Sequence, residues 1–279
     1  MADIFNEIMQ KFIAAGIENP RLETRLLIAS VLGVESGGIF ADIVLNDAQA
    51  EAVRRMAAQR TAHKPLDKIL GHREFYKADF IVNEDVLSPR PDTEILVEKA
   101  LQYMPQTARN VLDLGTGSGC IIESILLEKP DLHGVAVDIS LKALKTARQN
   151  AEKCGVATRL QLVRADWFAT DFAAQIGQKF DVIVTNPPYI PSSDIAELAP
   201  EVKDHDPRAA LDGGADGFDS YRRIAALMPD LLNDGGYVLI EAGIGQAQKI
   251  ATVFADYGLS LVEIAKDLGG IERCVILRK

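Results

Sequence analysis

Several features that mark common classes of protein are scarce or missing in this chain of 279 residues. No apolar run approaches the roughly 18 residues of a membrane helix. Asp3 and Glu7 interrupt the apolar N-terminal stretch, which predicts an amphipathic helix and not a signal peptide. The three cysteines lack CxxC spacing, so we expect small buried side chains in a reducing compartment; they are Cys120, Cys154 and Cys274.

Metal-ligand spacing and an excess of positive charge are missing as well. The four histidines, at positions 63, 72, 133 and 205, are scattered, and we predict no metal site. Residues 1–90 carry 11 basic and 13 acidic side chains, and residues 91–279 carry 19 and 27. An acidic domain repels a phosphate backbone over most of its surface, which argues against nucleic acid as the main partner. No heptad pattern or unusual apolar segment indicates an obligate partner, so we expect a monomer.

The first part of the chain is predicted to be helical. Apolar residues of the first 13 positions recur at helical spacing, "PRLETRLLIASVLG" is bounded by proline and glycine, and Asn46 or Asp47 can cap a third helix. Residues 1–70 offer no catalytic chemistry, and we interpret them as an all-helical domain for recognition or packing. Residues 71–90, with apolar positions between turn formers, predict a β-hairpin linker. Asp92 or Thr93 is expected to cap the next helix.

Residues 91–279 alternate between apolar strands, among them "NVLDLG", "HGVAVDI" and "FDVIVT", and amphipathic helices. Continuous apolar strands alternating with helices are typical of an α/β fold with a doubly wound, mostly parallel sheet. In such a sheet, ligands bind at the carboxyl ends of the strands. The residues that follow each strand are therefore the candidate site.

A glycine loop, "LDLGTGSGC", leaves the first of these strands with Gly115, Gly117 and Gly119. Its G-x-G-x-G spacing differs from the G-x-G-x-x-G of nicotinamide and flavin sites, because Cys120 stands where the last glycine would be. The loop also lacks the Lys-Ser/Thr of a phosphate loop. Taken alone, it is compatible with a cofactor site or with a purely structural turn.

Acidic and aromatic residues follow the next two strands. Asp138 comes 19 residues after Gly119, where a carboxylate can accept both hydrogen bonds of a ribose diol. Its alternative role is a helix cap, although Ser140 can also serve as that cap. Asp166 and Trp167 end the third strand and can bind an adenine amino group and ring.

"NPPY", residues 186–189, follows the strand "FDVIVT". The Asn186 side-chain oxygen and the Pro187 carbonyl can each accept a hydrogen bond from a planar NH2 group, because proline stiffens the backbone and leaves its carbonyls available. Tyr189, after Pro188, can cover the plane of that group. Holding both N–H groups reduces delocalisation of the nitrogen lone pair and aims it at a sulfonium methyl, so the tetrad predicts a methyl-transfer site without a strong general base.

With these residues, the chain closely resembles the release factor glutamine N5-methyltransferases. The resemblance extends over nearly the whole chain, through "SPRPDTE", "VLDLGTGSGCI", "NPPYI", "ALDGGADGFDSYRRI" and "LGGIERCVILRK". It implies a class I S-adenosylmethionine-dependent methyltransferase domain at 91–279 with a Rossmann-like sheet. The implied reaction methylates the glutamine of the Gly-Gly-Gln motif in peptide chain release factors, leaves S-adenosylhomocysteine, and takes place in the cytoplasm.

The resemblance also implies roles for individual residues. The cofactor's methionine part is expected at the loop Gly115, Thr116, Gly117, Ser118 and Gly119, its ribose at Asp138, and its adenine at Trp167 with Asp166. The substrate glutamine is expected at Asn186, Pro187, Pro188 and Tyr189, with Asn186 also near the cofactor. Two positions depart from the family pattern, namely Ser88, where isoleucine is usual, and Asp206, where glutamate is usual.

Two other functions remain compatible with the motifs. "NPPY" is also found in methyltransferases of nucleic-acid amino groups (adenine N6 or guanine N2), which the acidic charge and the lack of an evident base-recognition domain disfavour. A cofactor-binding assembly factor without catalysis is disfavoured by the intact tetrad. Competition by DNA or RNA would favour the first, and bound cofactor without transfer would favour the second.

Overall fold

The computed structural model describes residues 4–39 and 44–279. These residues divide into two compact units, of which one comprises residues 4–39 and 44–72 with 199–205 and the other residues 73–198 with 206–279. Asp3, part of the predicted amphipathic N-terminal helix, lies outside the described residues. Within the described part of the chain, no helix is both long and apolar enough to cross a membrane.

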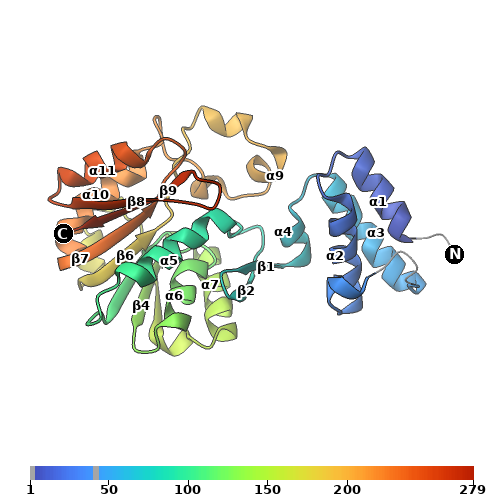
Figure 1. Ribbon diagram of the computed structural model, residues 1–279, viewed down its shortest axis with the longest axis horizontal. Coiled ribbons are helices and arrows are strands. Elements are labelled where there is room, and N and C mark those ends of the chain that lie inside the picture. Colours follow the sequence, from blue (N-terminus) through green and yellow to red (C-terminus); the bar gives the residue numbers. More distant parts are fainter. Residues whose placement is uncertain (1–3, 40–43) are drawn as a thin grey trace. The chain divides into compact units, whose positions relative to one another are not determined.

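The first unit is helical, as the periodicity predicts (its helices α1, α2 and α3 are blue in Figure 1). Its helices are α1 (Ile4–Ala14), α2 (Pro20–Leu32), α3 (Asp47–Thr61), α4 (Leu66–Leu70) and α9 (Pro200–Lys203), with a short 3-10 helix η1 (Ser36–Gly38). Asn46 caps α3 in a capping box with Gln49, which confirms one of the two predicted caps. Ile8, Phe12 and Leu27 lie fully buried in the core.

Strands β1 (His72–Phe75) and β2 (Ala78–Ile81) form a two-stranded sheet where a hairpin is predicted. Tyr76, between them, has a φ of 55°, the left-handed conformation of a tight turn. The following residues, Pro91–Thr93, form the 3-10 helix η2, which leads directly into α5 (Glu94–Tyr103).

The predicted cap of α5 is wrong. Thr93 occupies the N-cap position with helical dihedrals (φ −75°, ψ −18°), and its side chain makes no capping hydrogen bond. Helical dihedrals at the cap turn the side chain away from the free N–H groups that it would have to reach. The Asp92 carboxylate instead pairs with Arg273 at 3.2 Å.

A seven-stranded sheet forms the centre of the second unit, with strand order β5-β4-β3-β6-β7-β9-β8. Its strands are β3 (Asn110–Leu114), β4 (His133–Asp138), β5 (Leu160–Arg164), β6 (Phe180–Thr185), β7 (Leu232–Glu241), β8 (Ser260–Lys266) and β9 (Glu272–Arg278). β3 to β7 pair in parallel, and β9 runs antiparallel to both of its neighbours. The predicted doubly wound, mostly parallel sheet is confirmed.

Helices cover both faces of this sheet. α5, α6 (Cys120–Glu128) and α7 (Leu141–Lys153) pack on one face with Val111 and Val182. α8 (Phe172–Ile176), α10 (Asp219–Leu231) and α11 (Ala247–Ala255) pack on the other face with Leu112 and Ile183. Adjacent strand residues thus serve opposite cores, as their alternating side-chain directions require. The remaining 3-10 helices are η3 (Ala157–Arg159), η4 (Asp194–Glu197) and η5 (Arg208–Ala210).

The strand order reverses between β3 and β6. From β3 the chain moves outward through β4 to β5, and then it returns to the other side of β3 to form β6 and β7. At such a switch point, the loops leaving neighbouring strands diverge and open a crevice at the carboxyl ends. The glycine loop after β3 lies on one side of this crevice, and the "NPPY" segment after β6 lies on the other.

Candidate active site

One cavity of about 340 Å³ lies at this crevice, within the usual range of small-molecule sites. Most of the predicted site residues line it, namely Gly115, Thr116, Gly117, Ser118, Asp138, Asp166, Trp167, Asn186 and Pro188. Gly119, Pro187 and Tyr189 are not among its lining residues. The structure adds two segments to it, residues 85–90 and the small apolar side chains of Pro207, Ala209 and Ala210.

The glycine loop presents bare backbone to this cavity. Gly117 has a φ of 54°, and no heavy atom lies within 4 Å of the position that a Cβ would take there. At Gly115, with a φ of 77°, a Cβ would come within 3.1 Å of the Trp167 ring. Any side chain at these two positions would be strained, and one at Gly115 would also press against the indole ring. The cradle therefore suits a ligand that lies directly against the main chain.

The Asp138 carboxylate binds the backbone of the glycine loop. Its oxygens accept hydrogen bonds from the backbone N–H groups of Gly117 at 3.0 Å and Ser140 at 2.8 Å. Burial raises the Asp138 pKa, and these N–H groups oppose the rise. The Ser140 hydroxyl accepts from the Ala143 N–H and caps α7, so the carboxylate is not used as that cap.

The Trp167 indole packs beside the loop with a buried N–H that has no hydrogen-bond partner in the described structure. Its backbone carbonyl accepts a 2.6 Å hydrogen bond from Arg223 of α10, which holds the end of the β5 loop. Asp166 is exposed, and its carboxylate accepts from the Phe168 N–H at 2.8 Å. An aromatic face, an unpaired donor and an exposed carboxylate are features that suit a planar aminopurine.

The "NPPY" segment enters the cavity with Asn186 and Pro188, while Pro187 is buried. The Tyr189 hydroxyl lies 3.5 Å from a carboxyl oxygen of Glu241. Burial, together with the nearby Glu241 charge, raises the pKa of Tyr189 to about 12. Tyr189 is therefore neutral at physiological pH and offers a proton donor and a ring face.

The stretch "ALDGGADGFDSYR" packs against the backbone of this segment. A Cβ at Gly213 would lie 2.8 Å from the Tyr189 Cα, and one at Gly217 would lie 2.4 Å from the Tyr189 carbonyl oxygen. Real Cβ atoms do not approach backbone so closely, so only glycine fits at either position. The two motifs therefore pack backbone against backbone at the site.

Sequence reasoning missed two buried carboxyl groups at the site. Asp113 accepts a 2.6 Å hydrogen bond from the Thr116 hydroxyl, and burial raises its pKa to about 7. Glu241 ends β7, and burial raises its pKa while Thr93 and Arg273 oppose the rise. Glu241 could have been predicted from the sequence, because it is an acidic residue at the end of an apolar strand, as Asp138 is. Asp113 lies within the apolar "LDLG", where nothing marks it as buried and perturbed.

The two departures from the family pattern lie in or next to segment 85–90. Ser88 lines the cavity, and its buried hydroxyl has no partner in the described structure. Arg90 also lines the cavity and lies 4.0 Å from the Asp206 carboxylate. Within the described residues, no group of three or more histidine, cysteine or carboxylate side chains could hold a metal ion. Cys120 and Cys274 are buried and Cys154 is half-buried, all as free thiols.

Comparison with known proteins assigns the family. The family model for the methyltransferase small domain matches residues 91–201, and that for the PrmC N-terminal domain matches residues 3–71. A release factor glutamine methyltransferase of Rhodospirillum rubrum is 44% identical over 95% of this chain and 81% of that protein. One of Geobacter sulfurreducens is 43% identical over 93% of this chain and 90% of that protein.

The chain belongs to the release factor glutamine methyltransferase family. The family predicted from the motifs is thereby confirmed. A bifunctional methyltransferase of Rickettsia bellii is 37% identical to this chain. The match covers 97% of this chain but only 53% of the Rickettsia protein. Among solved structures, the hMettl16 catalytic domain in complex with a 3′UTR hairpin has a TM-score of 0.56 at 14% identity, covering 84% of this chain and 82% of that one. That likeness confirms the class I methyltransferase fold of this family member.

Proposed function

We propose that this protein transfers a methyl group from S-adenosylmethionine to the side-chain amide nitrogen, N5, of the glutamine in the Gly-Gly-Gln motif of peptide chain release factors. One observation carries the proposal. Asn186 and the bare glycine loop line the same cavity, at the switch point of a class I methyltransferase fold. The family membership supplies the protein substrate. S-adenosylhomocysteine is the product that leaves the cavity.

The residues around the cavity fit the cofactor. Gly115–Gly119 suit the methionine part, the Asp138 carboxylate the ribose hydroxyls, and Trp167 with Asp166 the adenine. Supporting observations are the unobstructed backbone at Gly117 and the unpartnered indole N–H of Trp167. When bound, the cofactor supplies an electrophilic methyl group on its sulfonium. Everything else that the reaction needs is positioning and charge.

Asn186 to Tyr189 hold the amide that is methylated. The Asn186 side-chain oxygen and the Pro187 carbonyl accept the two N–H bonds of the glutamine amide, and the Tyr189 ring covers its plane. Fixing both N–H groups reduces delocalisation of the lone pair and points it toward the methyl donor. The proton leaves after transfer, when the nitrogen has become strongly acidic, so no strong base is required. The high pKa of Tyr189 agrees with a residue that does not act as that base.

The test uses purified protein, S-adenosylmethionine and an unmodified release factor, with peptide mass spectrometry of the product. One methyl on the Gly-Gly-Gln glutamine is expected. Asn186→Ala should abolish transfer while cofactor binding persists. Asn233→Ala is the matched control, because Asn233 bonds to Asp181 at the amino ends of the strands, and it should transfer normally. Normal turnover by Asn186→Ala would refute the mechanism.

The protein's partners and location complete the proposal. The helical unit helps to receive the release factor, the protein works as a monomer, and it acts in the cytoplasm, where release factors act. Methylation of a DNA or RNA amino group is the competing function, and the −10 net charge disfavours it. Inhibition of methyl transfer by DNA or RNA at moderate salt would revive it.

A further inference from the structure

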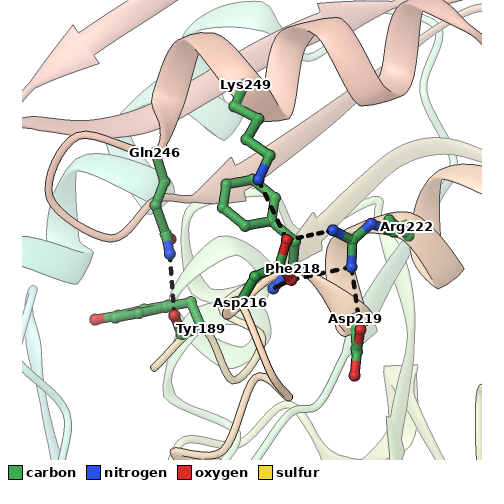
Figure 2. Close-up of polar contacts among 7 residues, drawn as sticks. All are labelled: Tyr189, Asp216, Phe218, Asp219, Arg222, Gln246 and Lys249. Atoms are coloured by element: carbon green, nitrogen blue, oxygen red, sulfur yellow. Dashed lines mark hydrogen bonds and ion pairs between the residues drawn. The ribbon is translucent and has the colours of Figure 1, made fainter. Parts of the chain in front are cut away.

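Gln246, at the N-terminal end of α11, contacts the "NPPY" segment at Tyr189 (Figure 2). Its side-chain nitrogen donates to the Tyr189 carbonyl oxygen at 3.0 Å. Its side-chain oxygen accepts from the Gly243 N–H at 3.1 Å and lies 3.2 Å from the Tyr221 hydroxyl. One half-buried amide thus connects the loop after β7, helix α10 and the "NPPY" segment.

Only one orientation of this amide satisfies its neighbours. The Gly243 N–H can only donate and the Tyr189 carbonyl can only accept, so the oxygen must face Gly243 and the nitrogen must face Tyr189. The Tyr221 hydroxyl, which also lies 3.0 Å from the Glu241 carbonyl oxygen, shares its proton between the two acceptors. The contact with Gly243 therefore fixes the Gln246 nitrogen as the donor to the Tyr189 carbonyl.

The contact between the Tyr189 carbonyl and Gln246 depends on two glycines. A Cβ at Gly217 would lie 2.4 Å from this carbonyl oxygen and 3.1 Å from the Gln246 side-chain nitrogen. A Cβ at Gly243 would lie 2.5 Å from the Gln246 side-chain oxygen. Glycines on both sides let the amide and the carbonyl meet.

The start of α11 is itself held in place. The Lys249 ammonium lies 3.9 Å from the centre of the Phe218 ring and 3.3 Å from the Asp216 carboxylate (Figure 2). Arg222 of α10 also pairs with Asp216. These contacts join α11 to the turn before α10, three residues after Gln246.

We propose that Gln246 is a positioning residue that sets the place of Asn186 and the Pro187 carbonyl through the Tyr189 carbonyl. Between these groups lie Pro187 and Pro188, whose rings fix φ. Few soft torsions remain to absorb a displacement at Tyr189, so a constraint there is transmitted to the two acceptors of the substrate amide. The inference rests on the proposed function for its catalytic consequence and on hydrogen bonding alone for its structural one.

The test is Gln246→Glu, which keeps the side chain's shape and its acceptor but replaces the donor facing Tyr189 with an oxygen. We expect kcat on the release factor to fall roughly 10- to 100-fold, because small misplacements of reacting groups are costly. The KM for S-adenosylmethionine should stay unchanged, because the glycine loop is attached to β3. Gln248→Glu is the matched control, since Gln248 is exposed on the same helix, and its kcat should stay within about twofold of wild type.

A second readout does not depend on activity. The Ile190 N–H donates to the Leu211 carbonyl, and the Gly213 N–H donates to the Ile190 carbonyl. Hydrogen exchange at both amides should quicken in Gln246→Glu and not in Gln248→Glu. Should Gln246→Glu fail to fold, Gln246→Asn keeps the amide but shortens its reach, and the same loss of kcat and faster exchange are expected.

Each outcome decides the proposal. Faster exchange together with a lower kcat at unchanged cofactor KM supports it. Unchanged exchange overturns it, and so does faster exchange with normal kcat, or a kcat loss matched by weaker cofactor binding. If wild-type protein methylates no release factor, the proposed function fails, and exchange at Ile190 and Gly213 alone decides whether Gln246 positions the segment.

Discussion

The Glu123 carboxyl is buried against the glycine loop, where a Cβ at Gly119 would lie 2.1 Å from one of its oxygens. Among the described residues, neither oxygen has a hydrogen-bond partner of normal geometry, although the Cys154 thiol lies close enough to lower the pKa. Burial, followed by the Asp113 charge, raises the Glu123 pKa to about 9. The native protein therefore holds this group protonated at neutral pH.

Glu123→Met is expected to stabilise the protein by about 1–3 kcal/mol near pH 8, because it removes unsatisfied buried polar atoms. A carboxyl whose pKa rises on folding favours the native state fully below its unfolded pKa, 4.5, and loses that contribution as pH rises toward about 9. The gain from Glu123→Met should therefore grow from pH 5 to pH 9. Urea unfolding of both proteins across this pH range measures the difference in their free energies of unfolding.

Glu152→Met is the control for this substitution, because Glu152 is exposed on α7. It should change the free energy of unfolding little at any pH in the range. A Glu123→Met variant whose stability relative to wild type stayed constant from pH 5 to pH 9 would show that the Glu123 pKa is not raised.

At the scale of elements, the connection between β6 and α10 forms one wall of the site. Gly213→Ala would place a Cβ 2.8 Å from the Tyr189 Cα and 2.9 Å from the Gly217 Cα. Backbone must shift to accept it, at a cost of about 1–3 kcal/mol. Methyl transfer should fall further than cofactor affinity, because the shift occurs at the substrate side of the cavity.

Calorimetric titration of the cofactor and methylation rates test this expectation. Gly37→Ala serves as the control, because no heavy atom lies within 4 Å of the added methyl. Normal methylation by Gly213→Ala would contradict the close packing of the two motifs.

At the scale of the whole molecule, the chain re-enters its first unit after 126 intervening residues, with residues 199–205. Buried Arg60 of α3 binds both Glu23, at 2.5 Å, and Glu201, at 2.6 Å. The Glu23 side chain is 13% exposed and that of Glu201 is 41% exposed. Water therefore screens the second ion pair much more than the first.

The two carboxylates give a matched pair of substitutions. Glu23→Gln should cost about 1.5–3 kcal/mol, as a hydrogen bond to a charged group that is mostly shielded from water. Glu201→Gln should cost about 0.2–1 kcal/mol, as an exposed ion pair. Hydrogen exchange of the α2 and α3 amides measures both in the intact protein. Equal costs would refute the argument from exposure.

Local patterns in the sequence determined much of the fold and of the candidate site. Alternating strands and helices predicted the doubly wound sheet, because side-chain periodicity is set within each element. Motifs directly after strands predicted that Gly115, Asp138, Trp167 and Asn186 would meet, because parallel strands bring their carboxyl ends to one edge. Family membership followed from the same motifs.

Only the tertiary structure decided which residues distant in the sequence contact these motifs. The contacts of Gln246 with Tyr189, and of Glu123 with Gly119, depend on how helices pack on the sheet. No short sequence pattern predicts that a single glutamine, or a glutamate in an apolar helix, will contact the site. The α5 cap was mispredicted for the same reason, since a tertiary partner, Arg273, engages Asp92. Periodicity encodes which face of an element is buried, whereas partners are chosen by packing between elements far apart in the chain.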